Sequence, residues 1–159
     1  MLRVRVSNDA YNLEKRFKVA SRGFVIKNNK IAILYSRKYN AYITPGGGVE
    51  KGESLEEACI REVKEETGYV VNTIKQIAIL DCDYPKARIE HNYFVCELVR
   101  ETAELNKTSH EIDQDLEVKW LSLEELKAAY ANKVDSFKYD IWMQRESIVI
   151  PELRDYIKK

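Results

Sequence analysis

Residues 47–69 read GGVEKGESLEEACIREVKEETGY, and this stretch determines how the rest of the chain divides into helices and strands. Its second half predicts an α-helix that begins at Leu55, because Ser54 and Glu57 form a capping-box pattern. Gly68 is placed to end this helix as a left-handed cap, since glycine adopts positive φ at little cost. The stretch therefore predicts a turn followed by one helix that ends at Gly68. This helix separates the strands before residue 47 from the elements after residue 69.

Three glutamates in this helix share one face. A helix turns about 100° per residue, so Glu62, Glu65 and Glu66 project together at positions i, i+3 and i+4. An isolated acidic face is usually solvated surface, but this one continues the side of the helix that carries Ala58 and Cys59. Burying carboxylates without partners is costly, whereas an oxygen-rich site for hard divalent cations would stabilise them. This face is therefore a candidate metal site, and a solvated acidic surface is the alternative until the glycines before the helix and Arg61 are considered.

The segments before the helix predict strands. Residues 16–36 predict an antiparallel hairpin, because RFKVASRGFVI and KIAILYS flank a Lys-Asn-Asn-Lys turn whose asparagines tolerate left-handed conformations. A short strand follows at residues 42–44 and is ended by Pro45 and three glycines. Residues 49–52 form another turn before the helix.

The segments after the helix predict two long strands, a short strand and further helices. The strands cover residues 69–81, 89–100 and 117–121, and the helices cover residues 123–130 and one or two parts of 137–159. The second long strand is apolar on both faces, which places it in the middle of a sheet. Residues 102–114 are polar and without periodicity, which is typical of a functional or mobile loop. This order predicts an α/β (α+β) fold, with helices on both sides of a mixed β-sheet.

Composition limits the class of protein. The chain has 159 residues and 45% hydrophobic content, which predicts one folded domain over residues 1–159. Lys plus Arg equals Asp plus Glu at 26 each, so no overall charge recruits nucleic acid or an anionic membrane. Cys59, Cys82 and Cys96 lack disulfide or zinc-ligand spacing and predict free buried thiols. Without a signal-peptide or membrane-spanning apolar stretch, we expect a soluble cytoplasmic protein.

Seven residues of the opening stretch are spaced as in a known enzyme family. They are Gly47, Glu53, Arg61, Glu62, Glu65, Glu66 and Gly68. This spacing resembles the signature of the Nudix hydrolases, the MutT-like family. Tyr69 stands where that signature usually has an aliphatic residue, but a tyrosine can still pack there. The resemblance implies a Nudix-type α/β/α sandwich with a mixed β-sheet.

The resemblance also implies a reaction, the hydrolysis of a nucleoside diphosphate linked to another moiety. Water would attack phosphorus with Mg²⁺ or Mn²⁺ bound, which agrees with the hard oxygen ligands that the sequence offers. By resemblance the metal ligands are three carboxylates and a glycine carbonyl, namely Glu62, Glu65, Glu66 and Gly47, with the Gly46 carbonyl as the alternative. Arg61 would orient a glutamate by a charge-assisted hydrogen bond. Glu53 would either bind the metal through water or brace the glycine loop.

The general base and the substrate contacts are less closely fixed by the motif. The base is either a motif glutamate, for which we take Glu65, or an acidic residue of the loop before Trp120. That loop offers Glu111, Asp113 and Asp115, of which we favour Glu111. For the substrate's phosphates and base, the candidates are the loop glycines and nearby cationic or ring side chains, namely Gly46, Gly48, Arg37, Lys38, Tyr42, Arg88 and His91. His91 is more readily explained as a structural residue.

Several substrates and one non-enzymatic role remain open at this point. A nucleoside triphosphate is our first expectation, and ADP-ribose, a dinucleoside polyphosphate or the 5′ end of RNA are alternatives. The neutral net charge disfavours a long RNA, because such binding uses many basic contacts. A non-catalytic module that binds a nucleotide is the other class, and it is disfavoured because all three acidic positions are kept. A homodimer is also possible through the aromatic C-terminal segment.

Overall fold

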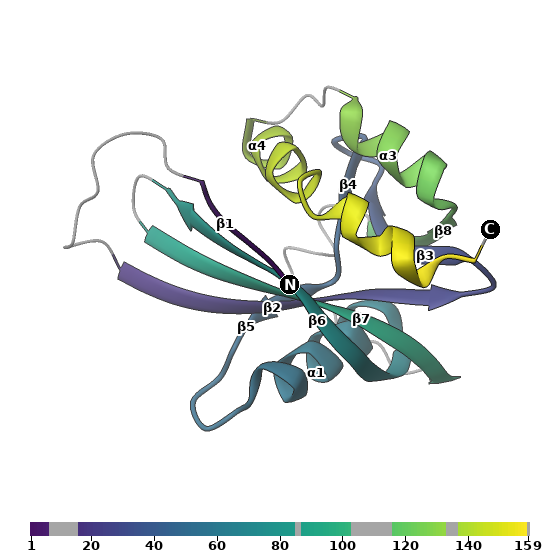
Figure 1. Ribbon diagram of the computed structural model, residues 1–159, viewed down its shortest axis with the longest axis horizontal. Coiled ribbons are helices and arrows are strands. Elements are labelled where there is room, and N and C mark those ends of the chain that lie inside the picture. Colours follow the sequence, from purple (N-terminus) through teal and green to yellow (C-terminus); the bar gives the residue numbers. More distant parts are fainter. Residues whose placement is uncertain (7–15, 85–86, 103–115, 133–136, 159) are drawn as a thin grey trace.

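The computed structural model describes residues 1–6, 16–84, 87–102, 116–132 and 137–158 (Figure 1). Its strands are β1 Leu2–Val6, β2 Arg16–Lys27, β3 Lys30–Ser36, β4 Ala41–Ile43, β5 Gly46–Gly48, β6 Tyr69–Asp83, β7 Ala87–Glu101 and β8 Leu116–Leu121. Its helices are α1 Leu55–Thr67, α3 Leu123–Ala131, α4 Phe137–Glu146 and the 3₁₀ helix η1 Ile150–Tyr156.

The strands form one mixed sheet in the order β1-β6-β7-β2-β3-β4. Strand β5 pairs with β2, and β8 pairs with β3. The pairs β1/β6 and β2/β7 are parallel, whereas the remaining pairs are antiparallel. Strand β7 lies between β6 and β2, which confirms the central position predicted from its apolar sequence.

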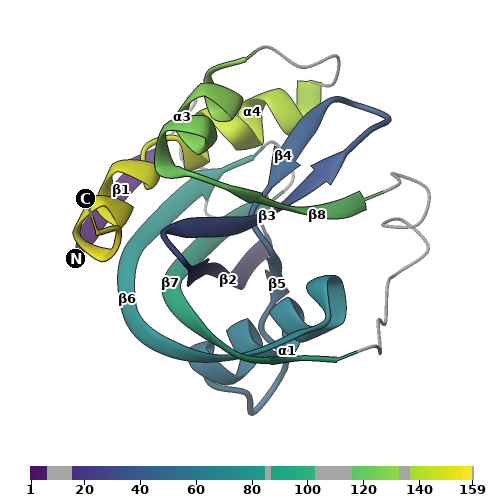
Figure 2. The ribbon, with the colours of Figure 1, turned by 90° about the vertical axis from the view of Figure 1, so that its right-hand side faces the viewer.

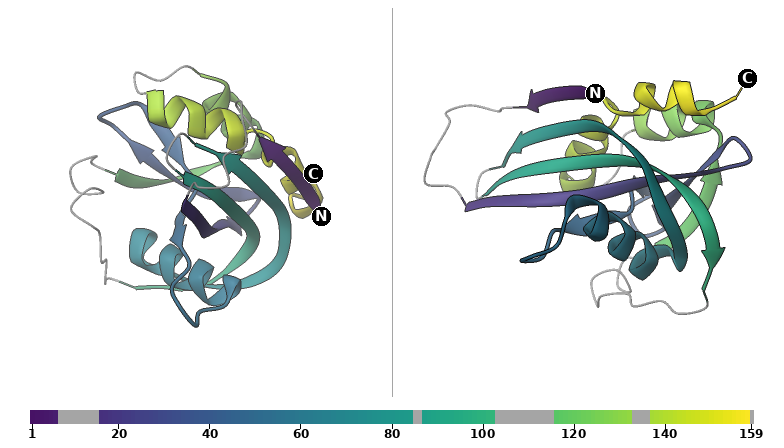
Figure 3. Two further views of the ribbon diagram at one scale, coloured as in Figure 1. Left: turned by 90° about the vertical axis from the view of Figure 1, so that its left-hand side faces the viewer. Right: turned by 60° about the horizontal axis from the view of Figure 1, so that its bottom comes forward.

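Helices cover both faces of this sheet. Helix α1 lies on one face, and α3, α4 and η1 lie on the other (Figures 1 and 3). Two apolar clusters fill the layers: α1 packs on the first through Cys59 and Val63, and the C-terminal helices pack on the second through Leu126, Met143 and Leu153. The arrangement confirms the predicted α/β/α sandwich.

The local signals around α1 and the hairpin are confirmed. Ser54 and Glu57 form both hydrogen bonds of the capping box, and Gly68 ends the helix with φ 77°. Asn28 and Asn29 have φ of 52° and 60°, as a tight turn between β2 and β3 requires. Hydrogen bonds and backbone conformations of neighbouring residues therefore determine where this helix and this hairpin turn begin and end.

Three features differ from the sequence-based expectation. Strand β1 was not predicted, although the alternation in LRVRV fits a half-buried strand. The glycines at 46–48 were expected to end a strand, but they form strand β5, because their backbone pairs with β2 in an antiparallel ladder. The two long strands each extend about two residues beyond their predicted ends, since β6 and β7 pair over almost their whole length.

The predictions for the cysteines and for the C-terminal helices are confirmed. Cys59, Cys82 and Cys96 are free and buried, as predicted. The C-terminal segment forms two packed pieces, α4 and η1, that separate before Pro151. No helix in the described residues is long and apolar enough to cross a membrane.

Candidate functional site

The glycine strand β5 packs directly against α1. A Cβ atom on Gly47 would lie 2.6 Å from the carboxyl carbon of Glu62, so the Glu62 carboxyl group would have to move away from the strand. The Gly46 N–H donates to Oε2 of Glu66 at 3.1 Å, and Glu66 is only 9% exposed. Glycine at position 47 therefore lets the carboxylate of Glu62 approach the backbone of β5. Strand β5 lies beside α1 (Figure 2).

Arg61 lies at the centre of the acidic cluster. Its guanidinium donates to both oxygens of Glu53, at 2.7 and 2.9 Å. The same group donates to Glu62 at 2.9 Å, to Glu65 at 3.3 Å and to the Gly48 carbonyl at 2.9 Å. One guanidinium thus donates to three carboxylates, with a fourth, that of Glu50, 3.8 Å from Nη1. Its hydrogen bond to the Gly48 carbonyl joins the glycine strand to the helix.

The carboxylates of this cluster differ in their electrostatic environment. Burial raises the pKa of Glu62, against the opposing effect of Arg61, and the nearby charge of Glu65 adds to the rise. Hydrogen bonds from Arg61 lower the pKa of Glu53. The cluster therefore carries more negative charge than Arg61 alone neutralises, and a bound cation would favour the ionised form of Glu62.

The donor set fits a hard divalent cation. It consists of carboxylate oxygens and backbone carbonyls, without thiolate or imidazole. In the described residues, no three His, Cys, Asp or Glu side chains are arranged so that they could already hold a metal ion. Arg61 accounts for this, because it draws Glu62 and Glu65 toward itself while Glu66 accepts from Gly46. The residues suit Mg²⁺ or Mn²⁺ in chemistry, and binding would require the side chains to turn toward the cation.

The structure brings most of the predicted motif residues together. They are Glu53, Arg61, Glu62, Glu65, Glu66, Gly46, Gly47 and Gly48. Arg37 instead pairs with Glu117 of β8 at 2.7 Å, and the Tyr42 ring packs against Tyr35 at 4.9 Å. Their predicted contacts with substrate stay predictions. Glu111, favoured as the base, lies outside the described residues.

Two further candidates are engaged elsewhere. His91 is 1% exposed, and its Nδ1 accepts from Nε of Arg22 at 3.2 Å, which agrees with a structural role. Arg88 forms two hydrogen bonds with Asp81, at 2.8 and 2.5 Å. His91 therefore contacts Arg22, which is paired with Gly46 of the glycine strand, whereas Arg88 pairs with Asp81.

The Arg88 pair predicts a pH-dependent contribution to stability. Hydrogen bonds from Arg88 lower the pKa of Asp81 in the folded protein, so the contribution is present above the unfolded pKa of about 3.9. It is lost as the pH falls through the folded pKa. We expect Asp81→Asn to reduce the free energy of unfolding by about 1 kcal/mol near pH 7 and by much less at about pH 2. Urea unfolding at both pH values measures this, and a loss independent of pH would contradict it.

One residue behind the glycine strand was missed at the sequence level. Arg22 of β2 is 3% exposed, and its Nη1 donates to the Thr44 carbonyl at 2.9 Å. The signal was available, because a lone arginine interrupts an apolar strand sequence. A buried arginine requires hydrogen-bond partners, so an arginine within an apolar strand indicates that its guanidinium donates to acceptors inside the protein.

A second buried polar group adjoins the same strand. The Thr44 hydroxyl donates to Oε2 of Glu146 and lies 3.0 Å from the Tyr130 hydroxyl. Glu146 is 2% exposed, and burial raises its pKa. Helices α3 and α4 thus contact the segment that leads into β5.

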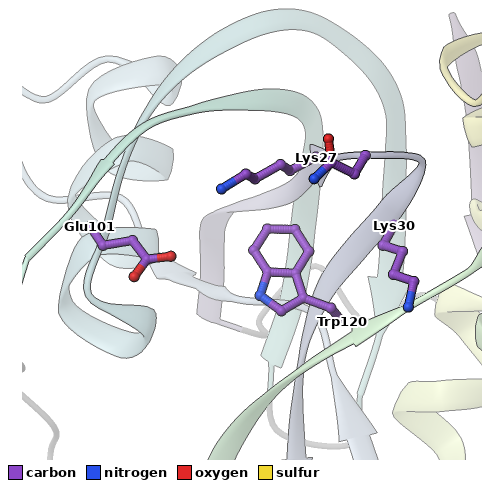
Figure 4. Close-up of a pocket in the computed structure, with 5 residues that line it drawn as sticks. Lys27, Lys30, Glu101 and Trp120 are labelled. Carbon is purple, nitrogen blue, oxygen red and sulfur yellow. The ribbon is translucent and has the colours of Figure 1, made fainter.

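Two cavities lie near these elements. The first, about 450 Å³, lies between the start of β2 and residues 48–51. Its charged lining residues are Arg16, Lys18 and Lys51, together with Glu50. The second, about 210 Å³, is shown in Figure 4, where Lys27 and Lys30 of the hairpin and Glu101 surround the ring of Trp120. Trp120 also donates to the Tyr69 hydroxyl at 3.1 Å and packs on the α1 cluster, so its ring is chiefly an apolar anchor. Only the first cavity adjoins the glycine strand.

Comparison with known proteins identifies the family. The NUDIX domain model matches residues 17–143. Nudix hydrolase 18, mitochondrial, of Arabidopsis thaliana is 30% identical over 135 residues, which is 84% of this chain and 74% of that protein. An ADP-ribose pyrophosphatase of Methanocaldococcus jannaschii is 47% identical over 64 residues, which is 38% of this chain and 37% of that protein. The chain belongs to the Nudix hydrolase family, whose members act on pyrophosphate bonds.

Solved structures confirm the fold. A NUDIX hydrolase from Nitrosomonas europaea superposes with a TM-score of 0.66 at 20% identity, and the match covers 89% of this chain and 88% of that one. At this identity the likeness concerns the fold alone. The alignment with the Methanocaldococcus protein spans little more than a third of that protein.

Proposed function

We propose that the protein hydrolyses a phosphoanhydride bond in a small nucleotide, using Mg²⁺ or Mn²⁺ bound at the acidic face of α1. The observation that carries this proposal is the close approach of the Glu62 carboxylate to Gly47. Beside it, Arg61 donates hydrogen bonds to three carboxylates, those of Glu53, Glu62 and Glu65. This arrangement concentrates oxygen ligands at the edge of a backbone strand. Such a site suits a cation that bridges phosphate oxygens.

Each side chain has a distinct proposed task. Glu62, Glu65 and Glu66, with the Gly47 carbonyl, would hold the metal, which would neutralise charge on the phosphates and acidify a water. Arg61 would keep the glutamates aligned, and Glu53 would brace Arg61 through its two hydrogen bonds. The Glu65 side chain is 36% exposed, and Arg61 donates to one of its oxygens at 3.3 Å. One carboxylate oxygen would bind the metal, and the other would accept a proton from the attacking water.

The nearby cavity supports an anionic substrate. Arg16, Lys18 and Lys51 outnumber one carboxylate, Glu50, around a space that begins at Gly48. Its volume of about 450 Å³ suits a small ligand. Positive side chains at this place would attract the phosphates of a nucleotide. A nucleoside triphosphate is the first candidate, and ADP-ribose is the second because a relative carries that name.

A substrate screen tests the proposal. Phosphate or nucleotide release would be measured for nucleoside triphosphates, ADP-ribose, dinucleoside polyphosphates and 5′-triphosphorylated RNA, each with Mg²⁺ and with Mn²⁺. We expect turnover of at least one small nucleotide, which EDTA abolishes. No turnover of any compound over a range of both metals would favour the non-catalytic binding module.

A further inference from the structure

Arg22 crosses directly over the glycine strand. It pairs with Gly46 in the register of β2 and β5, and a Cβ on Gly46 would lie 2.4 Å from Cγ of Arg22. The aliphatic part of Arg22 therefore occupies the space that any side chain at position 46 would need. The absence of a side chain at position 46 therefore allows Arg22 to pack directly on the Gly46 backbone.

The guanidinium of Arg22 is fixed on three sides. Nη1 donates to the Thr44 carbonyl at 2.9 Å, and Nε donates to Nδ1 of His91 at 3.2 Å. The guanidinium carbon lies 4.7 Å from the centre of the Trp142 ring on α4. Burial and the neighbouring arginines lower the pKa of His91 to about 2, so His91 is neutral and can accept this bond at working pH. The contacts join β7, α4 and the segment before β5.

The segment held by Arg22 leads straight to a proposed metal ligand. Thr44 is followed by Pro45, whose carbonyl accepts from the Gly23 N–H at 2.9 Å. The next N–H, that of Gly46, donates to Glu66 at 3.1 Å. The Pro45 carbonyl and the Gly46 N–H belong to one peptide plane, which Gly23 and Glu66 hold from opposite edges. The Thr44 carbonyl that Arg22 holds lies in the plane just before it.

We propose that Arg22 is a positioning residue, which clamps residues 44–46 against α4 and so aims the Gly46 N–H at Glu66. Its effect on metal binding rests on the proposed function, whereas its effect on the glycine strand does not. Lysine cannot replace it, because an ammonium lacks the planar fork that serves two acceptors and a ring at once. An arginine is thus required here for geometry as well as for charge.

Arg22→Lys tests this with selective ¹⁵N labelling of glycine, since the chain has six glycines and few signals to resolve. Amide exchange is measured for metal-free protein, with Gly68 as internal reference because its N–H donates to the Lys64 carbonyl within the cap of α1. We expect the Gly46 amide to exchange about tenfold faster, with Gly68 unchanged. We also expect Mn²⁺ to bind about tenfold more weakly, as is typical when a partner of a metal ligand is removed.

Arg145→Lys is the matched control. Arg145 is a buried residue of α4, and it lies over the Tyr84 ring and donates to the Asp83 carbonyl. A general loss of stability would appear in both variants, but the Gly46 amide should respond only to Arg22→Lys. Equal exchange of Gly46 in wild type and Arg22→Lys, or the same acceleration in both variants, would overturn the proposal.

A second variant keeps the proposal testable should Arg22→Lys unfold. His91→Leu removes one acceptor of the guanidinium while Arg22 stays in place, and we expect about threefold faster exchange of Gly46. Unchanged exchange in His91→Leu would then contradict the clamp. Absence of Mn²⁺ binding in the wild type would contradict the proposed function alone, because the exchange comparison needs no metal.

Discussion

Replacing Glu65 and Glu66 together by glutamine is expected to lower kcat with Mg²⁺ by on the order of a thousandfold. Glutamine keeps the shape of each side chain and an oxygen that can still accept the Gly46 N–H. It removes two of the three negative charges that would bind the cation. The fold should therefore persist while the stabilisation of the phosphate charge is lost, as steady-state kinetics on the substrate found in the screen would measure.

The control for this double variant lies on the same helix. Glu56 is exposed in the first turn of α1, on the side away from the sheet, and Glu56→Gln removes a charge without touching the cluster. Its kcat should stay within about twofold of wild type. Full activity in the Glu65→Gln and Glu66→Gln variant, measured at the same Mg²⁺ concentration, would refute the metal assignment.

Gly47→Ala is expected to reduce kcat/KM by on the order of a hundredfold and to lower the free energy of unfolding by roughly 1–3 kcal/mol. The new methyl would lie 2.6 Å from the carboxyl group of Glu62, so either the carboxylate or strand β5 must move. Either movement separates the proposed carboxylate ligand from the Gly47 carbonyl. Kinetics and urea unfolding measure the two effects.

The neighbouring glycine supplies a control for stability and metal affinity. A Cβ on Gly48 meets no heavy atom within 4 Å, and its φ is not positive, so Gly48→Ala should fold with nearly the stability of the wild type. Its Mn²⁺ affinity should also be close to that of the wild type. If Gly47→Ala matched Gly48→Ala in both properties, the close approach of Glu62 to the backbone would not matter to the site.

Elements with local chemical signals could be predicted from the sequence. The capping residues Ser54 and Gly68 and the turn residues Asn28 and Asn29 act within a few positions of their own backbone. The motif carboxylates could also be predicted, because helical spacing alone sets them on one face. Their common partner Arg61 sits in the same helix, so the cluster forms largely within one element.

Features that depend on distant segments could not be predicted in this way. Strand β1 is completed only by pairing with β6, far along the chain. The role of Arg22 depends on Thr44 and His91, which the fold alone brings to it. Contacts between residues far apart in the sequence leave no periodic pattern from which they could be predicted.

Some sequence-based hypotheses stay predictions. The base at Glu111 lies outside the described residues, and the substrate contacts of Arg37 and Tyr42 depend on a ligand. The interpretation of residues 1–159 as one domain, the cytoplasmic location and a homodimer are likewise untested. The location and the homodimer depend on the cell and on a second copy of the chain, and side-chain contacts within one chain do not determine them.

Mn²⁺ binding to the wild type and to Glu62→Gln, followed by electron paramagnetic resonance of the free ion, tests the central claim most directly. Glu62 is the carboxylate that lies against Gly47, and its replacement leaves the size of the side chain unchanged. We predict a saturable Mn²⁺ site in the wild type and binding at least about tenfold weaker in the variant. Equal affinity in the two proteins, or no saturable site in the wild type, would contradict the account of this cluster as a metal centre.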